Sequence, residues 1–304
     1  MTASTALDVL LNGRSLPSPR WQRRKLRWLL QRQAPFDELA EQIRCEPAIT
    51  GRIIGLANDA LAPGQSADAA VNAETLAAIE LPSLRQLFAE PALPPALCAG
   101  FDYQCYWSRA LAMACAARLA GDALRLGSAD ELFTCGLLAT IGELALATLR
   151  PLASAQALSG HADAAQALLP NEEARRFIPY RLVLSAGMMR SWGMPVLLCN
   201  AVACHGSPSG QGQTGSEASL GRLLQLASAV ADLVLLNGAG KRDAALGAAR
   251  ALGMDAADLD TLLRHSQADW IEWQDLPAAG MADRGAAPCA GGSRLPGSFF
   301  SEFV

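Results

Sequence analysis

Apolar residues recur along this chain at helical spacing, and no segment alternates apolar and polar residues with the β-branched bias of a strand. The pattern therefore predicts an all-α protein, a multi-helix bundle. Ser128 and Glu131 form a capping-box pattern, which predicts the start of one long helix reaching residue 149. The other predicted helices cover residues 20–30, 36–43, 47–60, 102–121, 172–192, 195–204, 215–237 and 255–264.

The chain has 304 residues, of which 51% are hydrophobic, enough to build a sizeable core. Its most apolar segments, residues 137–149 and 223–236, contain Glu143 and Asp232, so we expect buried helices and no membrane span. The first residues lack the pattern of a secretory signal. The eight cysteines are too sparse for a disulfide scaffold, so we expect them to be reduced and the protein to be cytoplasmic.

Proline-rich residues 91–95 separate two helical regions, and the Pro/Gly/Ala-rich end of the chain contains few core-forming residues. We therefore expect an N-terminal helical subdomain over residues 14–95 and a larger helical bundle over residues 96–270. Residues 271–304 are expected to form a flexible tail.

Charge is distributed unevenly along the chain. Seven basic and no acidic residues lie between Val9 and Phe36, which leaves 18 basic and 29 acidic residues elsewhere, a balance of −11. On a helix, four of the arginines form one stripe, with Leu26, Trp28, Leu29 and Leu30 expected on the other side. Its simplest interpretation is a solvated helix face, and its functional interpretation is a partner-binding face made of Arg20, Arg23, Arg24 and Arg27.

Several short motifs occur in a fixed order: LP at 16–17, ELAEQI at 38–43, EPAIT at 46–50, LAN at 56–58, FDYQCYW at 101–107, GLLATIG at 136–142 and SWGMP at 191–195. Together they resemble the HDOD domain, a bacterial signalling relative of the HD metal-dependent phosphohydrolases. Glu46 stands where that family usually has Asp. The resemblance spans about residues 16–232 and implies an N-terminal helical subdomain packed on a distorted HD-like bundle.

The resemblance also implies where an HD enzyme would hold its metal ligands. Those positions carry Arg109, Ala139, Thr140 and Arg181, and only His205 and Asp232 keep a ligand-type side chain. Two ligands are too few for a catalytic metal. For Glu143, one turn after Ala139, we expect a solvated or capping role. The two new arginines suggest a former metal pocket that has become a cradle for an anion or carboxylate, with residues Arg109, Ala139, Thr140, Arg181, His205 and Asp232.

Other candidate sites in the sequence are weak. Cys199, Cys204 and His205 do not converge on a regular helix, so a zinc site there is disfavoured. Cys98 and Cys105 could pair under oxidation, but two reduced thiols are the simpler interpretation. His161 and His265 are expected to be structural or solvated. We therefore expect no catalytic residue, no cofactor and no metal.

The resemblance implies a non-catalytic bacterial signal-transduction adaptor or regulator that acts by protein–protein contact. Its partners would be signalling proteins on other chains, and an anionic ligand or an acidic protein surface would suit the arginines. Two alternatives stay open: a divergent HD-type phosphohydrolase with an altered metal set, and, less favoured, a nucleic-acid-binding regulator that uses the N-terminal basic helix.

Overall fold

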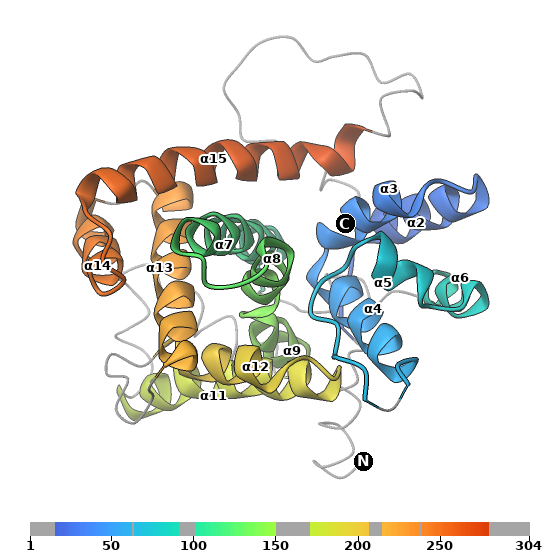
Figure 1. The fold of residues 1–304 in the computed structure, drawn as a ribbon, viewed down its shortest axis with the longest axis horizontal. Coiled ribbons are helices and arrows are strands. Elements are labelled where there is room, and N and C mark those ends of the chain that lie inside the picture. Colours follow the sequence, from blue (N-terminus) through green and yellow to red (C-terminus); the bar gives the residue numbers. More distant parts are fainter. Residues whose placement is uncertain are drawn as a thin grey trace.

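The structure is a computed structural model that describes residues 16–62, 64–90, 101–149, 171–206, 215–236 and 239–279. Within these residues the secondary structure is helical and contains no β-strand, which confirms the all-α prediction. Figure 1 shows an N-terminal group of helices, α2 to α6, beside a larger bundle built around α7. The core is continuous across both groups.

The N-terminal subdomain contains α2 (Arg20–Gln31), α3 (Phe36–Arg44), α4 (Pro47–Asp59), α5 (Ala73–Ala77) and α6 (Leu81–Ala89). Proline precedes α2 and α3 and opens α4, positions where its missing N–H costs nothing. Glu46 caps α4, because its Oε2 accepts a hydrogen bond of 2.7 Å from the Ile49 amide. The two short helices α5 and α6 were not predicted.

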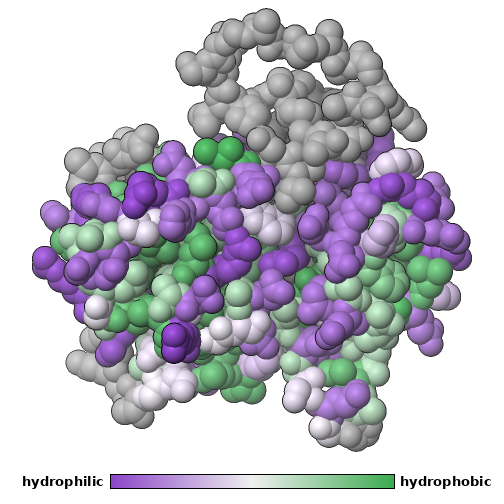
Figure 2. Space-filling view, turned by 45° about the horizontal axis from the view of Figure 1, so that its top comes forward, coloured by the Kyte–Doolittle hydropathy of each residue, from purple (hydrophilic) through white to green (hydrophobic). Residues whose placement is uncertain are grey.

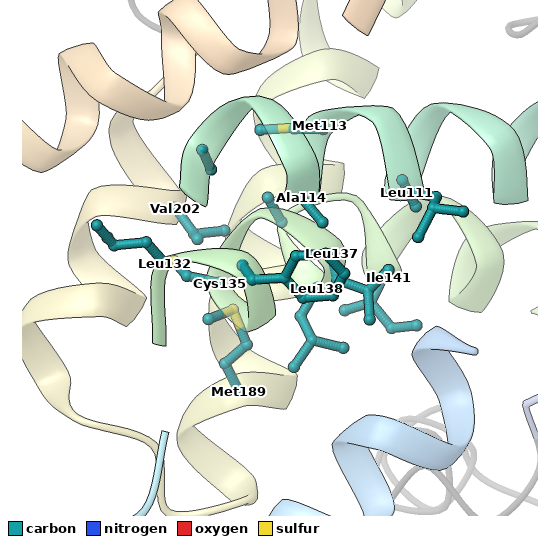
Figure 3. Close-up of a cluster of buried hydrophobic side chains, with 14 of the residues drawn as sticks. Leu111, Met113, Ala114, Leu132, Cys135, Leu137, Leu138, Ile141, Met189 and Val202 are labelled. Carbon is teal, nitrogen blue, oxygen red and sulfur yellow. The ribbon is translucent and has the colours of Figure 1, made fainter. Parts of the chain in front are cut away.

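The larger bundle is organised around α7 (Tyr103–Leu124), whose residues from Ala110 to Ala117 are all inaccessible to solvent. Around it lie α8 (Ala129–Leu138), α9 (Ile141–Leu149), α11 (Asn171–Ser191), α12 (Val196–Cys204), α13 (Ser216–Leu236), α14 (Ala239–Arg250) and α15 (Ala256–Ala279). In Figure 3, Leu111 and Ala114 of α7 face Leu137 and Leu138 of α8, with Met189 and Val202 closing the cluster. Alanines on α7 allow α8 to approach closely.

The single helix predicted up to residue 149 is wrong, because the chain breaks at Ala139 and Thr140 and continues as α9. The predicted capping box is also absent, since the Ser128 side chain makes no capping hydrogen bond. The break turns α9 toward α11, where the Ser185 Oγ accepts a hydrogen bond of 2.9 Å from the Gly142 amide. This break carries Ala139 and Thr140, the two positions that the resemblance assigns to the His-Asp pair of HD enzymes.

Side chains of the bundle join directly to the N-terminal subdomain. The Trp107 indole donates to the Cys45 carbonyl at 2.5 Å, and the Tyr103 hydroxyl donates to Glu46 Oε1 at 2.8 Å. The Trp192 ring lies so close to α4 that a Cβ added at Gly51 would be 2.3 Å from it. The two helical groups therefore pack as one body, and glycine at Gly51 is required by this contact.

The C-terminal helix is longer than predicted. α15 continues past residue 270, where we expected a tail, to Ala279, and its Trp270 and Trp273 are buried. It lies across α7 (Figure 1), where the Trp270 indole donates to the Ser108 carbonyl at 3.2 Å. The rest of the expected tail, residues 280–304, is outside the described residues. α14 was not predicted either.

Two segments of the described chain are long and apolar enough to cross a membrane by length and composition. Ala129–Thr148 is mostly buried and is interrupted by the break between α8 and α9, and less than half of Ser216–Leu235 is buried. Buried core helices of soluble proteins pass the same test of length and composition, so these two segments are weak evidence of a membrane span.

Gly142 should be irreplaceable by alanine, because an added Cβ would lie 2.1 Å from the Arg181 carbonyl oxygen, a backbone atom that cannot rotate away. We expect Gly142→Ala to lower the free energy of unfolding by about 1–3 kcal/mol, measured by urea denaturation. Gly247 in α14 is the matched control, since nothing lies within 4 Å of its Cβ position. Gly247→Ala should stabilise the helix by about 0.5–1 kcal/mol. An equal gain at both positions would contradict the close approach of α9 and α11.

Candidate functional site

A buried carboxylate lies between two arginines, at the positions that the resemblance assigns to an HD centre. Glu143 of α9 is only 5% exposed, and its Oε1 lies 2.6 Å from Arg181 Nη1 of α11 and 3.9 Å from Arg109 Nη1 of α7. A buried carboxylate needs such compensation, because transfer out of water costs several kcal/mol. One carboxylate thus ties three helices together at the break between α8 and α9.

Arg109 extends this network to a second carboxylate. Its Nε lies 3.0 Å from Asp232 Oδ1 of α13, and its Nη2 donates to Ser228 Oγ at 2.9 Å. Lys241 of α14 lies 3.4 Å from the other Asp232 oxygen. Burial opposes the charge of Arg109, but Glu143 and Asp232 outweigh it and raise the Arg109 pKa. Burial likewise works against the charge of Asp232, yet Arg109 and Lys241 hold the Asp232 pKa below its ordinary value.

His205 ends α12 beside this network and is 8% exposed. Its Nδ1 lies 2.8 Å from the Val202 carbonyl oxygen, which can only accept, so Nδ1 carries the proton in the neutral ring. Burial, together with the charges of Arg109 and Arg181, lowers the His205 pKa to about 4. The imidazole is therefore neutral at pH 7.

The structure brings together most of the pocket residues that the sequence singled out. Arg109, Arg181, His205 and Asp232 share one electrostatic network, and Ala139 and Thr140 form the buried break next to it. The solvated role expected for Glu143 is wrong, because this side chain is the buried centre of the network. The signal was in the sequence, since a lone acid inside an apolar helix must find a cation.

The hypothesis of a cradle for an external anion is also wrong. Both guanidiniums already pair with carboxylates of the chain itself, Glu143 and Asp232. The residues do not suit a divalent metal either, because cations occupy two of the former ligand positions and Ala139 and Thr140 offer no imidazole or carboxylate. Among the described residues, no group of three or more His, Cys, Asp or Glu side chains could hold a metal ion.

The cysteine and histidine candidates that the structure describes do not gather into a metal site. Cys199 is buried and its Sγ contacts the Met194 carbonyl at 3.6 Å, and burial raises the Cys199 pKa, which disfavours a metal-binding thiolate. Cys105 is exposed, whereas its suggested partner Cys98 is outside the described residues, as is His161. His265 lies within α15 and does not end a helix.

The basic stripe of α2 is narrower than predicted. Arg23 is 5% exposed and turned inward, where its Nε donates to Ser18 Oγ at 3.0 Å and its Nη1 to the Leu87 carbonyl at 2.9 Å. Arg20, Arg24 and Arg27 remain exposed. Trp28, predicted on the buried side, is 43% exposed and joins them. The predicted partner face therefore loses Arg23 and gains Trp28.

Removing the central carboxylate should be costly. Glu143→Ala removes the carboxylate that Arg109 and Arg181 share in a largely buried site. We therefore expect the free energy of unfolding to fall by about 3–5 kcal/mol. The exposed pair Arg242–Asp260 is the matched control, and Asp260→Ala should cost at most about 1 kcal/mol. The free energies of unfolding of both variants are measured by urea denaturation. Equal losses would show that the buried network contributes no more to stability than a surface pair.

Stability should also depend on the protonation of His205. Because the folded-state pKa is about 4 and the ordinary value is 6.5, the unfolded chain binds the proton first, and stability falls as pH drops from about 7 to 4. The loss from this group should reach about 3 kcal/mol. His205→Asn keeps a donor for the Val202 carbonyl without titrating, so its unfolding free energy should fall less over the same pH range. Parallel pH profiles of the two proteins would contradict this.

Comparisons with known proteins agree with this architecture. The family model described as the HDOD domain matches residues 16–208, more than half of the chain. The crystal structure of the MmoQ response regulator from Methylococcus capsulatus is 30% identical, with a TM-score of 0.65, covering 82% of this chain and 98% of that chain. No curated protein matches the chain in sequence.

A second crystal structure supports the fold alone. It is a virulence factor from Campylobacter jejuni, 15% identical with a TM-score of 0.64, and the match covers 90% of this chain and 98% of that one. The helical subdomain packed on an HD-like bundle is thus shared by chains of very different sequence. By its family match over residues 16–208, this chain belongs to the HDOD domain family.

Proposed function

We propose that this protein is a non-catalytic signal-transduction adaptor or regulator that acts by contact with other proteins. The observation that carries the proposal is the ion-pair network of Glu143 with Arg109 and Arg181, at the positions that the resemblance assigns to an HD metal centre. The resemblance to a protein described as a response regulator supports the signalling role. We place its action in the bacterial cytoplasm, with signalling proteins on other chains as partners.

The charges of the centre favour this function over phosphodiester hydrolysis. Hydrolysis by an HD centre requires a metal that activates water and neutralises phosphate. Here Arg109 and Asp232 already compensate each other, as do Arg181 and Glu143. A divalent cation would have to displace guanidiniums that are always charged. The site then contributes stability and shape, and function falls to the protein surface.

The test is metal binding and hydrolysis by the purified full chain. After incubation with Mn²⁺, Fe²⁺, Ni²⁺ or Zn²⁺ and dialysis, we expect substoichiometric metal by mass spectrometry. We also expect background hydrolysis of bis(p-nitrophenyl) phosphate, because the ligand positions carry cations. Stoichiometric metal with hydrolysis that disappears in His205→Ala would overturn the proposal in favour of a divergent phosphohydrolase. Hydrolysis unchanged in His205→Ala would have to arise outside this centre.

A further inference from the structure

Helix α2 contains five cations and no acid, and the fold uses only part of this charge. Arg23 donates hydrogen bonds to carbonyls at the C-terminal end of α6, and Lys25 is half-buried and engaged within the fold. The other three, Arg20, Arg24 and Arg27, are exposed. Within the part of the chain that the structure describes, no hydrogen bond or ion pair holds any of them.

This arrangement works against the stability of the helix. The N-terminus of a helix carries a partial positive charge and favours acids, yet the first turn of α2 has none and begins with Arg20. Arg20 and Arg24 are four residues apart and Arg24 and Arg27 three apart, so each pair of like charges repels on one face. Packing does not require these three exposed side chains to be basic, so their charge is available to a partner.

The arginine stripe continues onto an exposed aromatic ring. Trp28 lies one turn after Arg24 and is 43% exposed. The Arg32 guanidinium stacks 4.5 Å from its ring centroid, and Arg32 pairs with Glu38, which helps to fix the ring on the surface. Tryptophan and arginine are the residue types that dominate binding energy at protein interfaces. In Figure 1, α2 lies at the outer side of the N-terminal group, away from α13 and α14.

We propose that Arg20, Arg24, Arg27 and Trp28 form a docking face for an acidic helical segment of a partner protein. Carboxylates of the partner pair with the guanidiniums, and an apolar side chain of the partner covers Trp28. This inference rests on the proposed function, because it requires that the protein act by contact with other proteins. In Figure 2 the right-hand part of the molecule, where Figure 1 places the N-terminal group, carries both hydrophilic and hydrophobic surface, which suits a face that combines arginines with a tryptophan.

The size and field of the face favour a protein over a nucleic acid. The stripe extends about 10 Å along α2, two turns of helix, which matches three carboxylates on a facing helix. Nucleic-acid binding proteins commonly neutralise about 6–10 phosphates. The net charge of the chain is −4, so its overall field repels a polyanion of that length.

The experiment measures binding of the full chain to a fluorescent helical peptide of about 20 residues. The peptide carries three Glu at spacings i, i+4 and i+7 and Leu at i+8, and a matched peptide carries Gln in place of Glu. We expect the Glu peptide to bind, and its affinity to fall about tenfold in R20E/R24E/R27E and several-fold in W28A. The Gln peptide should bind more weakly, and a Lys peptide should bind the reversed variant better than the native chain.

A matched variant controls for net charge. R125E/R222E/R250E reverses three exposed arginines elsewhere on the surface, and it should change peptide affinity by less than about twofold at physiological salt, where distant charges are screened. Equal loss in both triple variants would overturn the inference, because attraction would then be nonspecific. Tighter, stripe-dependent binding of a DNA duplex of about 20 base pairs would also overturn it.

Thermal unfolding separates a docking role from a structural one. If the stripe serves a partner, R20Q/R24Q/R27Q should relieve repulsion and raise Tm by about 1–3 °C at low salt. A lower Tm would mean that the arginines stabilise the fold, which contradicts the inference. If the peptide does not bind and the protein shows no metal-dependent hydrolysis, the docking face is refuted and the adaptor function stands. If metal-dependent hydrolysis is found and His205→Ala abolishes it, the adaptor function itself is refuted.

Discussion

The structure depends on the compensation of one buried charge. Glu143 lies inside an otherwise apolar helix, and the carboxylate can remain charged there only because Arg181 and Arg109 reach it from α11 and α7. Arg109 in turn engages Asp232 of α13, which also pairs with Lys241 of α14. The requirement to pair one charge therefore fixes the relative positions of five helices around the break at Ala139 and Thr140.

A second buried carboxylate connects this bundle to the N-terminal subdomain. Glu46 caps α4 and accepts from Tyr103, the first residue of α7, while burial raises the Glu46 pKa against these hydrogen bonds. Tyr106, one turn further, lies between the two acids: burial and the charges of both Glu46 and Glu143 raise its pKa. The N-terminal end of α7 thus lies between the two carboxylates, so a displacement of either subdomain would disturb both.

Sequence periodicity predicted α7, α11 and α13 to within about three residues, because each buries an apolar face whose helical spacing is visible in the sequence. It missed the break at Ala139 and Thr140, since both residues are as buried as in a continuous helix. The contact of Gly142 with α11, which follows the break, is visible only in the structure. The family motifs indicated the site positions, but the side-chain partners of Arg109 and Arg181 could be identified only in the structure. Arg23 looked like its neighbours on a helical wheel, whereas contacts with the C-terminal end of α6 turn it inward.

Arginine at positions that the resemblance assigns to metal ligands is harder to reverse than loss of a single histidine would be. Arg109 and Arg181 balance Glu143 and Asp232, so the centre is close to electrically neutral without a metal ion. Restoring one imidazole would remove a cation and leave a buried carboxylate with a weaker partner, which costs stability before any metal can bind. The acids that would attract a divalent ion are the same acids that hold α7, α9, α11 and α13 together. Stability and metal binding therefore compete for one set of charges, and in this chain that set serves the fold.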